Sequence, residues 1–481
     1  MNRKLIRKAA VLFLIAMVAV SAAACGRAGS AGDDGEISEE SGIDGSGSFA
    51  EAHDAFTTTL TREENDDSPI PDPPEGYFDL VSYPSKVGDL AAYVSSDPGD
   101  GEKHPMIIWV VGGWGNGIDD FPWTYPEWDN DQTGSAFWQA GILTMYPSFR
   151  GGCGNPGYYE ALFGEVDDIV SAYEYAASLP YVDPERIYLG GHSTGGTRAL
   201  LASEYTDKFR AVFCFGAVDK IKYHNNSQFT FDTGSKEEHR MRSPIYWLDN
   251  IGSPTFLIEG RDGNSENLER MEEASENDNL HCYVIEGADH FSVLAPATRV
   301  AAQKILEDTG DECSISITQE ELDAAMEQGM TEIPAPVMTE RYLEEFGMTF
   351  SCPYVWNITV SEDGSSLEVY SGYDGANAWD MAALYITPCD AEGGEALRRI
   401  KENMEEQGYA MEEISIQDNP AVDGASMMQM DDGALYYQRC MSVQHGEECM
   451  VFYFIIYEDY MEEADVLFQQ IIDSVAFDAA S

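Results

Sequence analysis

The stretch Arg186-Ile-Tyr-Leu-Gly-Gly-His-Ser-Thr-Gly-Gly-Thr-Arg198 decides the fold. Its apolar start, residues 186–190, predicts a short strand, and residues 195–205 predict a helix. Between them, residues 191–195 read Gly-His-Ser-Thr-Gly, a G-x-S-x-G pattern. A serine on a sharp turn from strand to helix presents its hydroxyl at the top of a sheet. We therefore predict Ser193 to be a nucleophile.

Apolar strands and helices alternate on both sides of this turn. Residues 106–111, Met-Ile-Ile-Trp-Val-Val, form the near-continuous apolar run expected of a strand buried on both faces. The other expected strands are residues 142–146, 211–215, 255–259 and 281–286, and the expected helices are residues 160–178, 264–277 and 292–307. This alternation indicates βαβ units, and so we expect an α/β domain over residues 76–308, with a mainly parallel sheet and helices on both faces.

A serine hydroxyl needs a neighbouring base, and the base needs a carboxylate that orients it. His290 follows the last expected strand, in the loop Gly287-Ala-Asp-His-Phe291, and is our candidate for the base. The acid should follow a strand between Ser193 and His290. Asp262, just past the strand at residues 255–259, is the first choice, and Asp219 and Glu259 are alternatives.

Hydrolysis at a carbonyl also needs N–H donors for the negative charge that develops on its oxygen. The amide of Thr194, directly after the candidate nucleophile, is one expected donor. The second should come from the loop after residues 106–111, which reads Gly-Gly-Trp-Gly-Asn-Gly over residues 112–117. The amides of Trp114 and Gly113 are the candidates there.

Six short segments carry a resemblance to a known family. They are Pro147-Ser-Phe-Arg-Gly-Gly152, Gly164-Glu-Val-Asp-Asp168, Val182-Asp-Pro-Glu-Arg-Ile187, Gly191-His-Ser-Thr-Gly-Gly196, Lys208-Phe-Arg-Ala211 and Gly287-Ala-Asp-His-Phe291. Through them, residues 76–308 resemble the catalytic domain of the prolyl oligopeptidase family of serine peptidases and the related esterases. The resemblance implies an α/β-hydrolase fold with Ser193 as the nucleophile and His290 as the base.

A second, smaller domain is expected after a linker at residues 309–345, where Pro334-Ala-Pro336 interrupts the chain. Residues 346–477 contain strand-like runs at 366–371, 434–441 and 450–457 and helix-like runs at 395–407 and 460–474. This pattern predicts a small α+β domain. Phe350-Ser-Cys-Pro353, Trp356 and residues 471–477 resemble the PsbP/Mog1 type of small binding domain.

The N-terminus has the features of a bacterial export signal. Four basic residues lie within residues 1–8, an apolar run follows at residues 9–20, and small residues precede Cys25. The segment Ala23-Ala-Cys25 resembles the lipobox of bacterial lipoproteins, which implies a lipid on Cys25 and a position on the outer face of the cell membrane. Residues 26–75 are rich in Gly, Ser and acidic residues, and we expect a disordered tether there.

The charge balance limits the possible partners. Lys and Arg total 27 against 86 Asp and Glu, a net charge of −59, whereas nucleic-acid binding needs clustered cations. We expect no nucleic-acid partner, no cofactor and no metal. The expected function is hydrolysis of an ester or an amide in a small molecule or peptide. The alternative is a cell-surface binding lipoprotein with a degenerate hydrolase fold.

Overall fold

The structure is a computed structural model, and its two compact units divide after residue 330. It describes residues 47–74, 76–123, 130–221, 226–328, 338–343, 347–353, 356–360, 366–371, 382–389, 394–416, 419–429, 435–446, 448–458 and 461–477. Cys25 lies outside these ranges, so the predicted signal and lipid anchor remain predictions.

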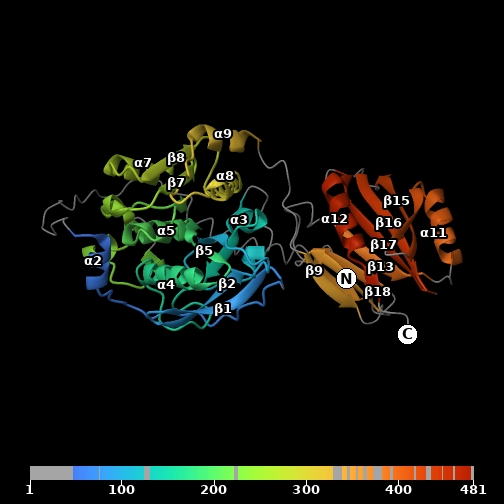
Figure 1. The fold of residues 1–481 in the computed structure, drawn as a ribbon, viewed down its shortest axis with the longest axis horizontal. Coiled ribbons are helices and arrows are strands. Elements are labelled where there is room, and N and C mark those ends of the chain that lie inside the picture. Colours follow the sequence, from blue (N-terminus) through green and yellow to red (C-terminus); the bar gives the residue numbers. More distant parts are fainter. Residues whose placement is uncertain are drawn as a thin grey trace. The chain divides into compact units, whose positions relative to one another are not determined.

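The first unit is built on an eight-stranded sheet (Figure 1). Its order is β1-β2-β4-β3-β5-β6-β7-β8. The strands are β1 (Phe78–Ser85), β2 (Gly88–Ser95), β3 (His104–Val110), β4 (Leu143–Pro147), β5 (Val182–His192), β6 (Val212–Phe215), β7 (Thr255–Gly260) and β8 (Leu280–Ile285). Strands β1 and β2 pair antiparallel, and the strands from β4 to β8 in this order are parallel.

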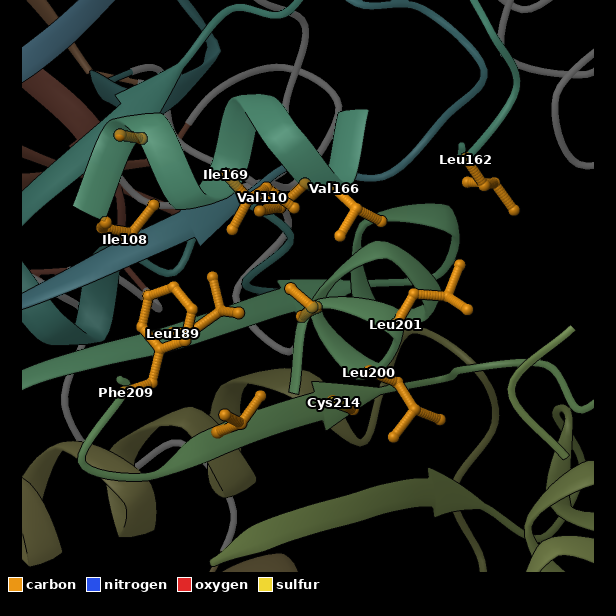
Figure 2. Packing of buried hydrophobic residues seen from close by; sticks show 14 of the residues in the cluster. Ile108, Val110, Leu162, Val166, Ile169, Leu189, Leu200, Leu201, Phe209 and Cys214 are labelled. Carbon is orange, nitrogen blue, oxygen red and sulfur yellow. The ribbon is translucent and has the colours of Figure 1, made fainter. Parts of the chain in front are cut away.

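Helices cover both faces of this sheet. The helices are α3 (Ser135–Gln139), α4 (Gly164–Ser178), α5 (Thr194–Tyr205), α7 (Ser265–Ala274) and α8 (Leu294–Glu307). Ile108 and Val110 of β3 share a core with Val166 and Ile169 of α4, as Figure 2 shows. Trp109, which points to the opposite face, packs against Phe137 of α3.

This arrangement is the α/β-hydrolase fold that the sequence predicts. Each strand expected from residue 106 onward in this unit is present, and the candidate turn lies between β5 and α5 near the middle of the sheet. Strands β3, β6 and β7 are buried along most of their length, which explains why their sequences are apolar at successive positions rather than alternating.

The expectation of a disordered tether over residues 26–75 does not hold for residues 47–74. They begin with α2 (Phe49–Ala55), whose Phe49 is fully buried in the core of the first unit. Beyond it, Leu60 forms a β-bridge with Phe231, and the Asp66 amide donates to the Gly151 carbonyl at 2.7 Å. Main-chain hydrogen bonds hold this segment, and amino-acid composition gives no sign of such bonds.

A short helix after the sheet also belongs to the first unit. Helix α9 (Gln319–Gln328) lies in the predicted linker, yet it packs against α8 and β8. The Gln319 side chain donates to the Val284 carbonyl at 3.1 Å, and Lys304 pairs with Glu321 at 2.5 Å. Among the described helices of the whole chain, none is both long and apolar enough to cross a bilayer.

The second unit contains two antiparallel sheets. The smaller one joins β18 (Ala476–Phe477), β10 (Met348–Pro353) and β9 (Met338–Leu343). The larger one has the order β11 (Trp356–Val360), β12 (Leu367–Ser371), β13 (Ala383–Pro388), β17 (Glu448–Tyr457), β16 (Leu435–His445), β15 (Asn419–Gln429) and β14 (Ala410–Ile416).

Two helices cover opposite faces of the larger sheet. Phe454 of β17 packs against Phe468 of α12 (Met461–Asp473), with ring centroids 4.1 Å apart. Tyr453, the preceding residue, belongs instead to the cluster that contains Ile400 of α11 (Gly394–Glu406). Successive strand residues point to opposite faces, and so the two helices lie on opposite sides. The prediction of a small α+β domain is therefore confirmed.

Candidate active site

Ser193 occupies a strained position between β5 and α5. Its backbone has φ 57° and ψ −117°, a conformation that is rare for a residue other than glycine and costs about 1–3 kcal/mol. Hydrogen bonds hold the turn. The Ser193 amide donates to the Phe215 carbonyl at 2.8 Å, and the Ser193 carbonyl accepts from the amide and hydroxyl of Thr197 at 3.0 and 3.1 Å. The predicted turn from strand to helix is confirmed.

The glycines of the motif are required because main chains meet there. A Cβ on Gly195 would lie 2.0 Å from the Val110 carbonyl oxygen, and one on Gly191 would lie 2.6 Å from the Gly195 carbonyl oxygen. Real Cβ atoms do not approach other atoms so closely. The G-x-S-x-G spacing therefore allows α5 to start directly against β3 and β5.

His290 reaches the same edge of the sheet from the loop after β8. Its Nδ1 lies 2.8 Å from Oε2 of Glu259, a residue of β7 with no exposed surface. A carboxylate accepts hydrogen bonds, so Nδ1 carries the proton and the lone pair of the neutral ring lies on Nε2. Nε2 is buried and has no hydrogen-bond partner. The imidazole is therefore held in the tautomer that a general base requires.

The His290 imidazole lies against Gly216, the residue after Phe215, which accepts the hydrogen bond of the Ser193 amide. A Cβ on Gly216 would lie 2.4 Å from His290 Cε1. The sequence analysis did not single out Gly216. Gly216 follows β6 directly and has a positive φ of 67°, which glycine adopts easily. Because glycine has no side chain, the His290 ring can lie against it.

The carboxylate beside His290 is Glu259, which corrects the first choice, Asp262. The Asp262 side chain is exposed, and its amide donates to the Ala288 carbonyl at 3.1 Å. Asp219 is buried, but its carboxylate accepts hydrogen bonds from Arg270 at 2.7 and 3.3 Å. Glu259, the third candidate from the sequence, also binds the Gly260 amide through its other oxygen at 2.8 Å.

The loop after β3 adjoins the turn, as the sequence predicts. A Cβ on Gly112 would lie 3.3 Å from Cβ of Ser193, and the Thr194 hydroxyl donates to the Gly113 carbonyl. The next residue, Trp114, packs edge-on against Phe229 with ring centroids 5.5 Å apart. The three expected donors of the oxyanion hole, the amides of Thr194, Gly113 and Trp114, thus belong to two segments that touch beside Ser193.

His192, which precedes Ser193 in the motif, is a second histidine at the site. It is buried, its Nε2 lies 3.1 Å from the His290 carbonyl oxygen, and the two rings are 4.5 Å apart. Burial, and then the electrostatic effect of the neighbouring His290, hold the pKa of His192 well below its usual value. His192 is therefore neutral, and its Nε2–H donates to the loop that carries His290.

Comparisons with known proteins identify a family that part of the first unit resembles. Residues 128–296 match the model of the prolyl oligopeptidase family. Through this match, the first unit is similar to the serine hydrolases of the prolyl oligopeptidase family. The match includes Ser193, Glu259 and His290 and lies inside the range predicted from the sequence. The family model does not extend into the second unit, so the PsbP/Mog1 resemblance stays a prediction.

Solved structures similar to this chain include peptidases and esterases. A Mycobacterium tuberculosis puromycin-hydrolyzing peptidase is 20% identical, with a TM-score of 0.39, over 48% of this chain and 39% of that one. A Pyrococcus horikoshii acylaminoacyl peptidase is 17% identical, with a TM-score of 0.40, over 51% of this chain and 43% of that one. A Pyrococcus furiosus esterase is 14% identical, with a TM-score of 0.40, over 51% of this chain and 97% of that one.

The match thus spans less than half the length of each of these two peptidases. No curated protein matches the sequence.

Proposed function

We propose that this protein is an exported, lipid-anchored serine hydrolase that cleaves an ester or amide bond through an acyl-enzyme. The observation that carries the proposal is the buried 2.8 Å contact between Glu259 and Nδ1 of His290, which leaves the Nε2 lone pair unbound at the turn that holds Ser193. A serine, a histidine in this tautomer and a buried carboxylate are the parts that acyl transfer needs.

In the first half of the reaction, the Ser193 oxygen attacks the substrate carbonyl carbon while Nε2 of His290 takes the hydroxyl proton. The imidazolium that forms is stabilised by the negative charge of Glu259. The carbonyl oxygen becomes an oxyanion, and the Thr194 amide and an amide from the Gly113–Trp114 segment donate to it. The C–O or C–N bond then breaks, and Nε2 returns the proton to the leaving group.

In the second half, water replaces the leaving group. Nε2 of His290 removes a proton from the water, whose oxygen attacks the acyl carbon. The bond from the acyl carbon to the Ser193 oxygen then breaks, and Nε2 returns the proton to that oxygen, which releases the acid and free Ser193. Burial of Glu259 supports this cycle, because a charge that water screens poorly interacts more strongly with the imidazolium.

A fluorophosphonate probe tests the nucleophile. The wild-type protein should be labelled at Ser193, and Ser193→Ala should not be labelled. Ser178→Ala, a change at an exposed serine on α4, is the matched control and should be labelled like the wild type. Labelling that persists in Ser193→Ala would refute the proposal. A panel of p-nitrophenyl esters and peptide amides then distinguishes esterase from peptidase activity, and no turnover on any member would favour the alternative of a binding lipoprotein.

The proposed anchor needs a separate test, because it rests on the residues around Cys25 alone. Bacteria grown with radiolabelled palmitate should incorporate label into the wild-type protein, and the protein should sediment with membranes. Cys25→Ser should lose the label while Ser193 stays reactive. Incorporation of palmitate by Cys25→Ser would contradict lipidation at this position.

A further inference from the structure

Outside the active site, a buried histidine of α2 faces two carboxylates. His53 is 3% exposed, and its Nδ1 lies 4.0 Å from Oδ1 of Asp54 and 4.0 Å from Oδ1 of Asp167 on α4. The three atoms all lie within 4.8 Å of one another. Among the described residues, this is the one group of at least three His, Cys, Asp or Glu side chains with the spacing of metal ligands.

The orientation of the imidazole makes Nδ1 an acceptor that lacks a donor. Nε2 of His53 lies 3.1 Å from the Phe163 carbonyl oxygen, so Nε2 carries the proton. Nδ1 is buried and has no hydrogen-bond partner, although two carboxylate oxygens lie near it. The Tyr205 hydroxyl donates to Oδ1 of Asp54 at 2.9 Å, and Lys86 donates to Asp167. The group left without a donor is therefore the Nδ1 lone pair, which faces two carboxylates and suits a cation.

The surroundings hold this ring in place. It stacks on Phe163 with centroids 4.2 Å apart, and the edges of Phe49 and Tyr205 contact it at 5.6 and 5.2 Å. The Nε2–H bond to a main-chain carbonyl is the usual outer contact of a histidine that binds a metal through its other nitrogen. The site therefore has both a lone pair in position and the support that fixes its direction.

Two cations already lie near the cluster. Nη2 of Arg150 is 3.8 Å from Oδ2 of Asp167, and Lys86 is closer. The Lys86 ammonium is 2.8 Å from Asp167 Oδ1 and 3.7 Å from Asp54 Oδ1. Its side chain is 60% exposed, so it can swing into solvent at little cost, and it donates no hydrogen bond to His53 Nδ1. Lys86 thus neutralises part of the carboxylate charge but leaves the imidazole unsatisfied.

We propose that His53 Nδ1, Asp54 and Asp167 bind a divalent transition-metal ion of the Zn²⁺ class that displaces the Lys86 ammonium. Zn²⁺ accepts nitrogen and carboxylate oxygen at about 2.0–2.2 Å, which puts tetrahedral ligands about 3.4 Å apart. The observed separations of 4.0 Å need only a small inward movement. Asp54 is the partner that would move, because its side chain is 55% exposed and, of the described residues outside the cluster, only the Tyr205 hydroxyl and Lys86 contact its carboxylate. Water would complete the coordination.

Such an ion would join the N-terminal segment to the catalytic unit. His53 and Asp54 belong to α2, whereas Asp167 belongs to α4 in the middle of the first unit. Metal binding would therefore slow the detachment of residues 47–56, the part of the chain that follows the proposed membrane anchor. The role is structural, and neither Ser193 nor His290 takes part in it.

Co²⁺, whose visible absorption reports its ligands, is the direct probe. After treatment with EDTA, the protein should bind one equivalent of Co²⁺, which Zn²⁺ displaces. Lys86→Met should bind the ion more tightly, since the competing ammonium is gone. His53→Gln and Asp54→Asn should weaken binding by about 100-fold or more. His104→Gln is the matched control, because His104 pairs with Asp100 at 3.0 Å on the surface.

Two results would overturn the proposal. The first is no saturable binding of one Co²⁺ by the wild-type protein, even if Lys86→Met binds it. The second is an unchanged affinity in Asp54→Asn, which is informative even if His53→Gln fails to fold, because Asp54 is largely exposed. Limited proteolysis gives an independent readout, in which Zn²⁺ should protect residues 47–56 of the wild type but not of Asp54→Asn.

Discussion

Glu259 accepts a hydrogen bond from Nδ1 of His290 at 2.8 Å, and both side chains are buried. The contact joins the end of β7 to the loop after β8, so that one carboxylate fixes both the tautomer and the direction of the ring. This contact identifies Glu259, rather than Asp262, as the carboxylate beside His290. Asp262 lies three residues further along the chain, and its side chain is exposed to solvent.

Replacing Glu259 with Gln should abolish most of the activity. An amide removes the charge that stabilises the imidazolium and favours the wrong tautomer, so kcat should fall by about 10,000-fold. Asp262→Asn is the matched control and should change kcat little. Steady-state kinetics on the best substrate of the panel would measure both. A larger loss in Asp262→Asn than in Glu259→Gln would contradict the assignment.

Gly216→Ala should displace His290. The new Cβ would lie 2.4 Å from Cε1 of the ring, at a residue with φ of 67°. Gly154→Ala adds a Cβ at a similar φ of 74° with no atom within 4 Å. Both changes should cost about 1–2 kcal/mol of stability from the backbone alone. Only Gly216→Ala should lose probe labelling, and equal labelling of the two variants would be evidence against the contact.

The hydrogen bond from Thr194 to the Gly113 carbonyl should position the loop that supplies an oxyanion donor. Thr194→Val keeps the shape of the side chain but removes the hydroxyl. Loss of a hydrogen bond worth about 1 kcal/mol predicts a fall in kcat of about fivefold, with a smaller change in KM. Stopped-flow measurement of acylation would test this. An unchanged acylation rate would mean that the loop keeps its place without this bond.

Glu204 predicts an unusual dependence of stability on pH. It is buried on α5, neither carboxylate oxygen has a hydrogen-bond partner, and burial raises its pKa well above the usual value. The folded state therefore keeps a proton that the unfolded state releases above pH 4.5. From that pH up to the folded pKa, the stability should fall as pH rises, by up to about 1.4 kcal/mol per unit.

Glu204→Met should remove this part of the pH dependence and should stabilise the protein most at alkaline pH. Glu273→Met, at an exposed position of α7, is the control and should follow the wild-type curve. Urea unfolding at a series of pH values measures both. A Glu204→Met curve parallel to that of the wild type would show that the folded protein does not hold this proton.

Arg150 and Asp168 form a buried ion pair that should contribute strongly to stability. The guanidinium donates through Nε and NH2 to the two carboxylate oxygens, each at 2.9 Å, and the Arg150 amide adds a third bond at 3.0 Å. Asp168→Asn removes the carboxylate that binds two nitrogens of the guanidinium and leaves Glu160, at 2.9 Å, as its nearest charged partner. The change should cost about 3 kcal/mol in urea unfolding. Lys208→Met breaks an exposed pair with Glu174 and should cost at most about 1 kcal/mol.

Much of the candidate site could be predicted from the sequence, and the two segments that contain this ion pair could be recognised in it. Arg150 and Asp168 lie in two of the segments that carry the family resemblance, and Ser193 and His290 follow from chain order and from their places after strands. The identity of the acid beside His290 could not be predicted, because the sequence does not show how closely the turn after β7 packs against the loop after β8. A Cβ on Gly260 would lie 2.4 Å from the Ala288 carbonyl oxygen, and this close packing directs Asp262 outward.

The packing of residues 47–74 was also beyond the sequence analysis. Their composition is that of a flexible segment, with few large apolar residues. Phe49 fills a place in the core, and main-chain bonds such as that from Tyr159 to Glu64, at 2.9 Å, fix the rest. Such bonds depend on which loops lie alongside, and a local pattern of side chains does not encode that information.

The main chain, rather than the serine side chain, sets the position of residue 193. Its amide and carbonyl form hydrogen bonds with Phe215 and Thr197. The flanking residues of the motif, Gly191 and Gly195, are glycines because the neighbouring main chains leave no room for a side chain. The scaffold is therefore open to a change of chemistry. In a Ser193→Cys variant, a thiol would stand at the start of α5, where the helix terminus favours a thiolate. Such a protein would form thioesters, which exchange readily with amines, and would give a starting point for engineering a ligase from a hydrolase.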